Sequence, residues 1–343
     1  MSDVLGIDIG ANSIKVISLT KEGKNIVLDV VGETKNSKID WMKDPEKNIK
    51  QINEVAAEIK ALLNDLKIKT KKAVVCLPED QVISRLIRLP PLKDSEIVDV
   101  LKFEAETFVP YPLDKISLDY EIIEKDEAGR LTVFVIAARN DLINAYIKLF
   151  KSINMTLVAL ESPSVTFRRV ANVAVSASNG IMVIDFGEKF SNIVALNKGQ
   201  ICFTRSLSVG GESLTRAISV NLGLDMASAE EYKKVYGLKE NELEGKIRVA
   251  LTPVLNSLMD DIRKAVALFS EDQGKQVDLL VLSGGGANLP GLAEELTKTT
   301  GIEVQIIQPF IFINTSKITL PFNLSLEGCR FSLAIGLALR GLV

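Results

Sequence analysis

Residues 4–19 read Val-Leu-Gly-Ile-Asp-Ile-Gly-Ala-Asn-Ser-Ile-Lys-Val-Ile-Ser-Leu, and this stretch decides the fold. The short apolar run at 4–9 predicts a buried strand, and Gly10–Ser13 has the residue types of a tight turn. Residues 14–19 are again mostly apolar, with polar Lys15 and Ser18 between them. The pattern predicts a β-hairpin, which differs from the strand–loop–helix of a P-loop or a Rossmann site.

A second stretch repeats this pattern about half a chain later. Residues 181–187 read Ile-Met-Val-Ile-Asp-Phe-Gly and lead, through 188–191, into another apolar run at 192–196. Asp185 follows Asp8 by 177 residues, and the glycines and apolar positions around both acids align at that offset. We therefore expect two related domains that each open with an Asp-x-Gly hairpin. Two unrelated hairpins are the alternative.

Apolar periodicity predicts the elements between and after the hairpins. The first half has predicted helices at 46–66, 94–108 and 141–153 and predicted strands at 73–77, 82–89, 117–123 and 131–138. The second half has predicted strands at 201–207 and 278–282, with helices at 210–222, 227–236 and 245–270 and one that starts at Pro290. The alternation of strands and helices indicates an α/β protein, with residues 84–155 as a separate inserted subdomain.

Composition excludes several classes of function. The 343-residue chain has 41 Lys and Arg against 44 Asp and Glu, a net charge of −3, which argues against nucleic-acid binding by bulk charge. It has no histidine, which removes Ser-His-Asp and Cys-His nucleophiles and imidazole metal sites. Three distant cysteines, Cys76, Cys202 and Cys329, indicate neither a zinc site nor a disulfide framework. The acidic start and the lack of a long apolar run predict a cytoplasmic protein that reaches a membrane only through a partner.

The turn after Asp8 has the residues of a phosphate-binding loop. Gly10 permits a sharp bend, the amides that follow can surround an anion, and Lys15 can add a positive charge. Asp8 cannot bind phosphate itself, but it can act together with Mg²⁺, through water. The alternative is a plain hairpin in which the acid caps its own turn.

Three glycines, Gly284–Gly286, follow the predicted strand at 278–282 and precede a predicted helix. Backbone without side chains can form a flat floor for a planar group, and a helix N-terminus favours anions. The same glycines can instead allow close packing of a helix on a strand. Both interpretations remain open from these residues alone.

Taken together, these parts resemble the actin-like ATPase superfamily and, within it, the PilM family of FtsA-like proteins of type IV pilus assembly. The resemblance covers essentially the whole chain and rests on residues 6–15, 183–193, 210–214, 229–233, 282–292 and 334–341. It implies an α/β actin-like ATPase fold of duplicated RNase H-like domains with a small inserted α+β subdomain of the FtsA 1C type. The implied domains are residues 1–83, completed by about 156–178 and 328–343; the inserted 84–155; and 179–327, with a helical part at about 208–274.

The resemblance also implies a site for ATP or ADP with Mg²⁺. Asp8 and Asp185 match the two catalytic acids that hold magnesium-bound water, and Glu161 falls near the position that orients the attacking water. The implied nucleotide-binding residues are Gly10, Ala11, Asn12, Ser13 and Lys15 in the first loop, Gly187, Glu188, Lys189 and Ser191 in the second, and Gly210, Gly211, Glu230, Lys233, Gly284, Gly285, Gly286 and Asn288 around the adenosine.

Two departures from the family pattern affect the expected activity. Glu188-Lys189-Phe190-Ser191 stands where small residues and a threonine are usual, so Ser191 would have to take the place of that threonine. Glu161 fits a surface or interface acid as well as a catalytic position. We therefore expect ATP binding with hydrolysis that is slow or dependent on a partner.

The resemblance implies a partner, the N-terminal cytoplasmic peptide of a PilN-like inner-membrane protein. The candidate groove residues in the inserted subdomain are Arg85, Arg88, Phe103, Phe108 and Tyr111, although the apolar ones can equally form the core of that subdomain. The expected function is a cytoplasmic ATP-binding scaffold of the type IV pilus platform whose affinity for partners is set by its nucleotide state. Other pilus-machine components and a second copy of the chain are further candidate partners. The alternatives are an FtsA-like filament-forming ATPase and a small-molecule kinase.

Two further features are left without a function at this stage. Residues 67–72, Lys-Ile-Lys-Thr-Lys-Lys, form a basic cluster that we expect to be a solvated helix end. Trp41 lies in a polar stretch and is interpreted as the anchor of a loop.

Overall fold

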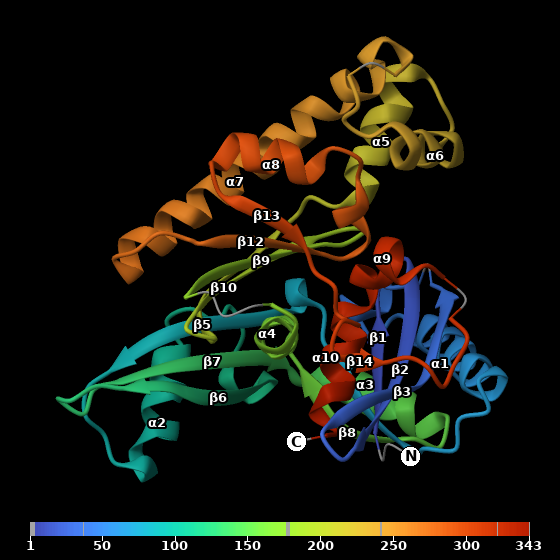
Figure 1. Ribbon diagram of the computed structural model, residues 1–343. Helices are drawn as coiled ribbons and strands as arrows, with labels where there is room; N and C mark the ends of the chain where they lie inside the picture. Colours follow the sequence, from blue (N-terminus) through green and yellow to red (C-terminus); the bar gives the residue numbers. More distant parts are fainter. Residues whose placement is uncertain (1–3, 37, 176–178, 241, 321, 343) are drawn as a thin grey trace. The chain divides into compact units, whose positions relative to one another are not determined.

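The computed structural model describes residues 4–36, 38–175, 179–240, 242–320 and 322–342. The chain divides into two compact units (Figure 1): unit 1 is Met1–Thr166 with Ala334–Val343, and unit 2 is Phe167–Leu333. Two expectations from the sequence concern residues outside the described ranges. These are the acidic chain start, at residues 1–3, and the domain boundary near residue 178.

Unit 1 contains a sheet with the strand order β3-β2-β1-β4-β8. Its strands are β1 (Leu5–Ile9), β2 (Ser13–Glu22), β3 (Asn25–Lys35), β4 (Lys72–Cys76) and β8 (Thr156–Glu161). β1, β2 and β3 pair antiparallel, whereas β1, β4 and β8 run parallel. Helices α1 (Ile49–Asp65) and α3 (Asn140–Ser152) contribute buried apolar residues to the core of this sheet.

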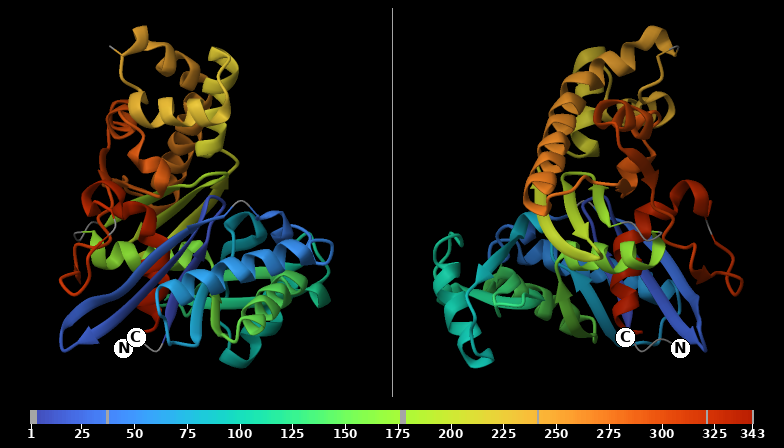
Figure 2. Two further views of the ribbon diagram at one scale, coloured as in Figure 1. Left: turned by 90° about the vertical axis from the view of Figure 1, so that its right-hand side faces the viewer. Right: turned by 60° about the vertical axis from the view of Figure 1, so that its left-hand side comes forward.

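Unit 2 repeats this arrangement with the strand order β11-β10-β9-β12-β13. Its elements are β9 (Gly180–Phe186), β10 (Ser191–Asn197), β11 (Gln200–Leu207), α5 (Gly211–Leu222), α6 (Met226–Tyr236), α7 (Lys246–Gln273), β12 (Leu279–Ser283), α8 (Leu292–Thr300) and β13 (Glu303–Ile306). β9, β10 and β11 pair antiparallel, and β9, β12 and β13 run parallel. Figure 2 shows α5 and α6 gathered with α7 at one end of this unit.

The repeat extends to individual backbone pairs. Asp8 lies opposite Lys15 in the first hairpin, and Asp185 lies opposite Asn192 in the second, so both members of the pair shift by the same 177 residues. The expectation of two related halves, each opening with a hairpin, is confirmed.

The inserted segment forms a three-stranded sheet in the order β5-β7-β6. Its elements are β5 (Val82–Leu89), α2 (Asp94–Ala105), β6 (Ile116–Lys125) and β7 (Leu131–Arg139). Ile97 and Leu101 of α2 pack on Ile87, Val133 and Val135 of the sheet, so the helix covers one face (Figure 1). The remaining helices and strand are α4 (Pro163–Ala174), β14 (Ile313–Asn314), α9 (Leu324–Glu327) and α10 (Ser332–Arg340).

Several details differ from the sequence-based expectations. α3, expected within the inserted segment, packs instead in the core beside β1, β2 and β4 of unit 1 through Leu142, Tyr146 and Phe150. Trp41 is fully buried in that same core, and its ring lies 4.9 Å from the ring of Tyr146. Trp41 lies in the short 3₁₀ helix Asp40–Met42 between β3 and α1, so its buried ring anchors this connection in the core, where Tyr146 of α3 is its aromatic partner.

The helix expected to start at Pro290 starts later. α8 begins at Leu292, after Gly291 in a left-handed conformation with φ of 82°, so Pro290 lies outside the first helical turn. The glycine run before it contains a short 3₁₀ helix at Gly285–Asn288, where a loop was expected. Strands β3 and β8 and helix α4 were not anticipated from the sequence.

Gly6 on β1 is required by close packing. A Cβ atom added there would lie 2.2 Å from the carbonyl oxygen of Ala334, which belongs to α10 in the same unit. Helix and strand backbones touch here, and no flexible side chain can move aside.

We expect Gly6→Ala to lower the free energy of unfolding by about 3 kcal/mol, because overpacking against backbone must displace the helix. Gly285→Ala, where an added Cβ meets nothing within 4 Å, is the matched control and should change the free energy of unfolding by less than about 0.5 kcal/mol. Urea-induced unfolding measures both. Equal effects of the two substitutions would contradict this account.

Candidate functional site

Asp8 is a buried carboxyl group near the end of β1, with 8% of its surface exposed. Lys15, opposite it on β2, places Nζ 3.7 Å from Asp8 Oδ2 and 3.9 Å from Glu33 Oε1. Burial raises the pKa of Asp8, and the nearby Lys15 ammonium only partly opposes this shift. The first predicted acid and the first predicted cation are thus brought together, at a distance that leaves the carboxylate weakly compensated.

The turn after Asp8 is held by hydrogen bonds within the chain. The Gly10 amide donates to the Ser13 carbonyl at 3.0 Å, and the Asn36 side chain donates to the Gly10 carbonyl at 2.7 Å. The Asn36 amide donates to the Asn12 carbonyl at 2.8 Å. Asn36, which sequence reasoning missed, fixes the turn from the end of β3, and the Gly10 amide is already used inside the turn.

Glu161 is buried at the end of β8, with 5% of its surface exposed. It forms an ion pair with Arg340, and it accepts a hydrogen bond from the Thr166 hydroxyl at 3.1 Å. Glu161 is therefore not a surface acid, because a buried carboxylate with a bound guanidinium is part of the interior of unit 1; the interface and catalytic interpretations stay predictions.

The second hairpin, in unit 2, closes in the same way as the first. The Gly187 amide donates to the Phe190 carbonyl at 3.0 Å. Asp185, at the corresponding position before the turn, lies opposite Asn192 on β10 and beside Ser283 on β12.

Ser191 follows this turn and is fully buried. Its hydroxyl donates to the Val209 carbonyl at 2.6 Å, so the proton that a phosphate-binding threonine would offer is used within the protein. Lys189 in the same turn is half-buried.

The start of α5 is seated on the second turn. The Gly211 amide donates to the Gly187 carbonyl at 2.9 Å, and the Glu212 amide donates to the Glu188 carbonyl at 2.8 Å. A Cβ atom on Gly210 would lie 2.4 Å from the Glu188 carbonyl oxygen. Gly210 is therefore explained by close packing, and two amides of the helix N-terminus are satisfied by the loop.

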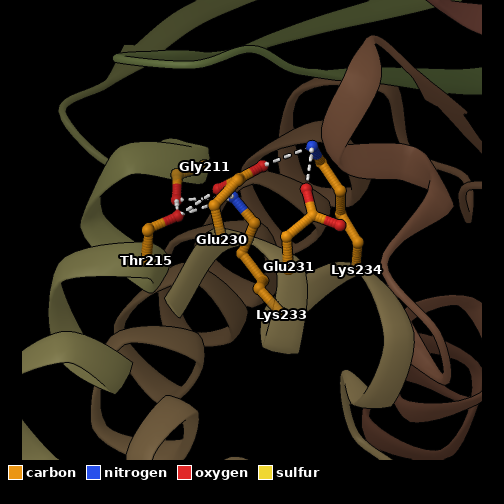
Figure 3. Close-up of polar contacts among 6 residues, drawn as sticks. All are labelled: Gly211, Thr215, Glu230, Glu231, Lys233 and Lys234. Carbon is orange, nitrogen blue, oxygen red and sulfur yellow. Dashed lines mark hydrogen bonds and ion pairs between the residues drawn. The ribbon is translucent and has the colours of Figure 1, made fainter. Parts of the chain in front are cut away.

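A buried polar cluster joins α5 to α6 (Figure 3). Lys233 is 8% exposed, and its Nζ donates to the Gly211 carbonyl at 3.0 Å and to the Thr215 hydroxyl at 2.8 Å. It also lies 2.6 Å from Glu230 Oε2, which in turn lies 2.5 Å from the Thr215 hydroxyl. All three ammonium protons of Lys233 thus have partners, and Glu230 balances its charge. Thr215 was missed by sequence reasoning, although its spacing of four residues from Gly211 placed it on the same helix face.

Two acids near Lys233 have pKa values that are shifted in opposite directions. Burial raises the pKa of Glu230, but the hydrogen bonds from Lys233 and Thr215 outweigh burial, and the pKa lies below its ordinary value. Glu188, in the second turn, is also near Lys233, but burial dominates and raises the pKa of Glu188. Lys234 lies outside the cluster and pairs with both Glu230 and Glu231 at 3.5 Å (Figure 3).

The glycine run divides into two kinds of position. Gly284 has a φ of 80°, and a Cβ there would lie 2.6 Å from the Phe186 carbonyl oxygen; a Cβ on Gly286 would lie 2.5 Å from the Phe186 ring. These two glycines are required by packing on β9. Gly285 is exposed, and a Cβ there would meet nothing within 4 Å. Open backbone for a planar ligand is therefore confined to Gly285 in this run.

Asn288 is held by α9 and by the residues that follow it. Its side-chain amide donates to the Leu326 carbonyl at 2.5 Å, and the Cys329 thiol lies 3.6 Å from its carbonyl oxygen. These contacts fix the orientation of the amide beside the glycine run.

The five predicted groove residues of the inserted subdomain differ in their surroundings. The Arg85 guanidinium lies over the Phe108 ring at 5.2 Å, and Phe108 packs against the cores on that sheet. The Tyr111 ring lies 5.9 Å from the Arg139 guanidinium. Phe103 on α2 is 69% exposed, and Arg88 is exposed on β5. Phe108 thus contributes to the core of the subdomain, as the alternative interpretation expected.

A cavity of about 410 Å³ lies elsewhere in the same subdomain, between α2 and β6. It is lined by Val98, Leu101, Lys102, Leu113, Asp114, Ile116, Leu118, Asp119, Tyr120 and Val135. Its floor is apolar and its rim carries charges of both signs. None of the five predicted groove residues lines it. The lining side chains come from α2, β6 and their neighbours, which are brought together only when the subdomain folds.

Two classes of feature are not observed in the described part of the chain. No group of three or more His, Cys, Asp or Glu side chains there is placed to hold a metal ion. None of the helices described combines the length and the apolar character needed to cross a membrane.

The chain is similar to several characterised proteins. Residues 6–342 match the family model described as type IV pilus assembly protein PilM. Cell division protein FtsA of Streptococcus pneumoniae serotype 2 (strain D39 / NCTC 7466) is 27% identical over 354 residues, which cover 89% of this chain and 75% of that protein.

Solved structures share the fold. A chain of a PilM-PilN type IV pilus biogenesis complex is 26% identical, with a TM-score of 0.86 and coverage of 99% of both chains. MreB 5 of Spiroplasma citri bound to AMPPNP is 12% identical, with a TM-score of 0.54 over 97% of this chain and 94% of that one. The chain has the actin-like ATPase fold.

We expect Asp8→Asn to raise the free energy of unfolding at pH 7. The folded state raises the pKa of Asp8, so the folded protein binds this proton more tightly than the unfolded chain does. The folded protein therefore loses stability as the pH rises from the ordinary pKa of 3.8 through the raised pKa. The asparagine side chain of the variant does not ionise, so the variant does not lose this stability. Lys15 keeps Glu33 as a neighbour in the variant.

The measurement is urea unfolding of both proteins between pH 3 and pH 8, with the exposed Glu127→Gln as the control. The gain from Asp8→Asn should shrink towards zero below about pH 3.8. A gain that is independent of pH, or a loss at pH 7, would show that burial does not dominate at Asp8.

Proposed function

Because the chain belongs to the family of the type IV pilus assembly protein PilM, we propose that it is an ATP-binding scaffold that docks the N-terminal cytoplasmic segment of a PilN-like membrane protein. The observation that carries this proposal is the similarity along 99% of the chain, at 26% identity, to a chain solved in a PilM-PilN complex. In this proposal the protein is cytoplasmic and is held at the inner membrane by its partner.

The cavity between α2 and β6 supports peptide binding by the inserted subdomain. Its deeper lining is apolar, since Leu101 and Val135 are 2% and 0% exposed. β6 is also an edge strand of its sheet, so an extended peptide can pair with its backbone while one apolar side chain enters the cavity. The predicted residues Arg85, Arg88, Phe103 and Tyr111 remain candidates for contacts outside the cavity.

Features in each unit support nucleotide binding. Both contain the same glycine turn after an acid, and unit 2 adds the cluster of Gly211, Glu230 and Lys233 and the open backbone of Gly285. In this proposal the turns of Gly10 and Gly187 face phosphates, and the residues of unit 2 contact the adenosine.

The residues also fit Mg²⁺. Asp8 is a buried carboxyl whose nearest cation, Lys15, is 3.7 Å away, so a hard cation would compensate it better than the protein does. Asp8 and Asp185 would hold such an ion through water, and the ion would neutralise phosphate charge. Glu161, by contrast, is engaged by Arg340, which supports slow or partner-dependent hydrolysis.

For nucleotide binding, we expect Asp8→Ala and Asp185→Ala each to weaken Mg-ATP binding by about tenfold or more. Isothermal titration calorimetry measures the affinity, and circular dichroism checks that both variants fold. Glu127→Ala, an exposed acid of the inserted subdomain, is the control. Unchanged affinity in both aspartate variants would reject the proposed magnesium role.

For partner binding, we expect Val98→Asp and Tyr120→Ala to weaken binding of a PilN-like N-terminal peptide by about tenfold, since they line the cavity and are 45% and 36% exposed. Val249→Asp on α7, where the valine is 71% exposed, is the control. Fluorescence anisotropy with a labelled peptide gives the affinity, and Mg-ATP binding should stay the same. Full peptide binding by both cavity variants would place the peptide elsewhere.

A further inference from the structure

One end of unit 1 carries six exposed lysines on two neighbouring helix–strand connections. The lysines are Lys67, Lys69 and Lys71 between α1 and β4, Lys72 at the start of β4, and Lys148 and Lys151 in the last turns of α3. α1 and α3 are in contact, and both end here. The Thr156 amide at the start of β8 donates to the Lys71 carbonyl at 2.7 Å, which joins the two connections. We call these six lysines the basic end.

The basic end has little local compensation. None of its six lysines forms an ion pair with a residue that the structure describes. The tip of the β2–β3 hairpin lies at the same end of the sheet, since Leu5 of β1 is opposite both Ser18 of β2 and Ala73 of β4. Among the residues that the structure describes, this end also carries Asp65, Glu22, Asp29, Lys21 and Lys24. Lysines outnumber these acids, so this end is positive in a chain of net charge −3.

Helix electrostatics account for only part of this charge. Lysines in the last turn of a helix are stabilised by the helix dipole, which explains Lys151 and, just beyond α1, Lys67. Lys69 and Lys71 lie beyond that turn, in the connection to β4, and Lys72 is the first residue of β4. Helix stability therefore does not explain why these three lysines are grouped here.

One exposed apolar side chain accompanies the lysines. Ile147 precedes Lys148 on α3 and is 46% exposed, on the side of the helix away from the buried Leu142, Tyr146 and Leu149. An aliphatic side chain thus lies beside Lys148 at the surface, where its contact with water is unfavourable.

We propose that the basic end binds the anionic surface of a phospholipid bilayer directly. Clusters of four to eight lysines are attracted to acidic lipid headgroups, and neighbouring aliphatic side chains can enter the interface. Single-stranded nucleic acid fits less well, because the basic end contains neither arginine forks nor aromatic rings on which bases stack. The proposal adds direct membrane contact to the contact through a partner, and it depends on neither the nucleotide nor the peptide proposal.

Each lysine close to an anionic leaflet contributes about fivefold to partitioning, and the attraction falls off within a Debye length of about 10 Å at 0.1 M salt. Removing three of the six should therefore weaken binding by about 100-fold. The same range makes the binding sensitive to salt.

The test is co-sedimentation of the full chain with vesicles of phosphatidylcholine alone or mixed with phosphatidylglycerol. We expect binding only to the anionic vesicles, and its loss in Lys69→Gln/Lys71→Gln/Lys72→Gln. Lys50→Gln/Lys239→Gln/Lys298→Gln removes the same charge from exposed positions elsewhere and should bind as the parent does. Ile147→Ser should weaken binding several-fold at constant charge.

Four outcomes would overturn the proposal: no preference for phosphatidylglycerol, equal losses in the two triple variants, binding that survives 0.5 M salt, or binding of single-stranded RNA without binding of vesicles. Thermal unfolding of both triple variants checks that they are folded. Because the vesicles contain no protein partner and no nucleotide, the result separates this proposal from those above.

Discussion

A glycine amide that donates to a carbonyl three residues further on closes the opening turn of both units, and the sheets extend outward from these turns. A Cβ would lie 3.1 Å from the Ser13 carbonyl oxygen at Gly10 and 2.8 Å from the Phe190 carbonyl oxygen at Gly187. Side chains are thus unfavourable at both turns, and each leaves an acid two residues before it, on the first strand. The position of Asp8 and Asp185 is therefore a consequence of backbone geometry, whatever ligand they meet.

The sequence predicted those parts of the fold that depend on neighbouring residues. Both hairpins, the limits of β5 and the start of α5 follow from local alternation, prolines and glycines. β3 could not be predicted in the same way, because its burial pattern comes from pairing with β2 and from helix α1. Trp41 likewise sits in a polar stretch, and only the distant ring of Tyr146 explains its burial.

The candidate site shows the same limit. Gly211, Glu230 and Lys233 were identified by resemblance, but their bonds through Thr215 require α5 and α6 to be placed side by side. Gly284 and Gly285 are adjacent residues of the same type, yet a Cβ atom on Gly284 would collide with Phe186, whereas one on Gly285 would meet nothing. Such differences depend on what an added carbon would touch, and no single-sequence pattern carries that information.

The two units have their extra helices and strands in different connections between the sheet strands. In unit 1 the path from β4 to β8 includes β5, α2, β6 and β7, whereas in unit 2 the path from β11 to β12 includes α5 and α6. The paired strands keep the same order in both. Mutations that lengthen or reshape one connection therefore leave the strand register of the other unit intact, so a lineage can inherit changes in one connection without changes in the other.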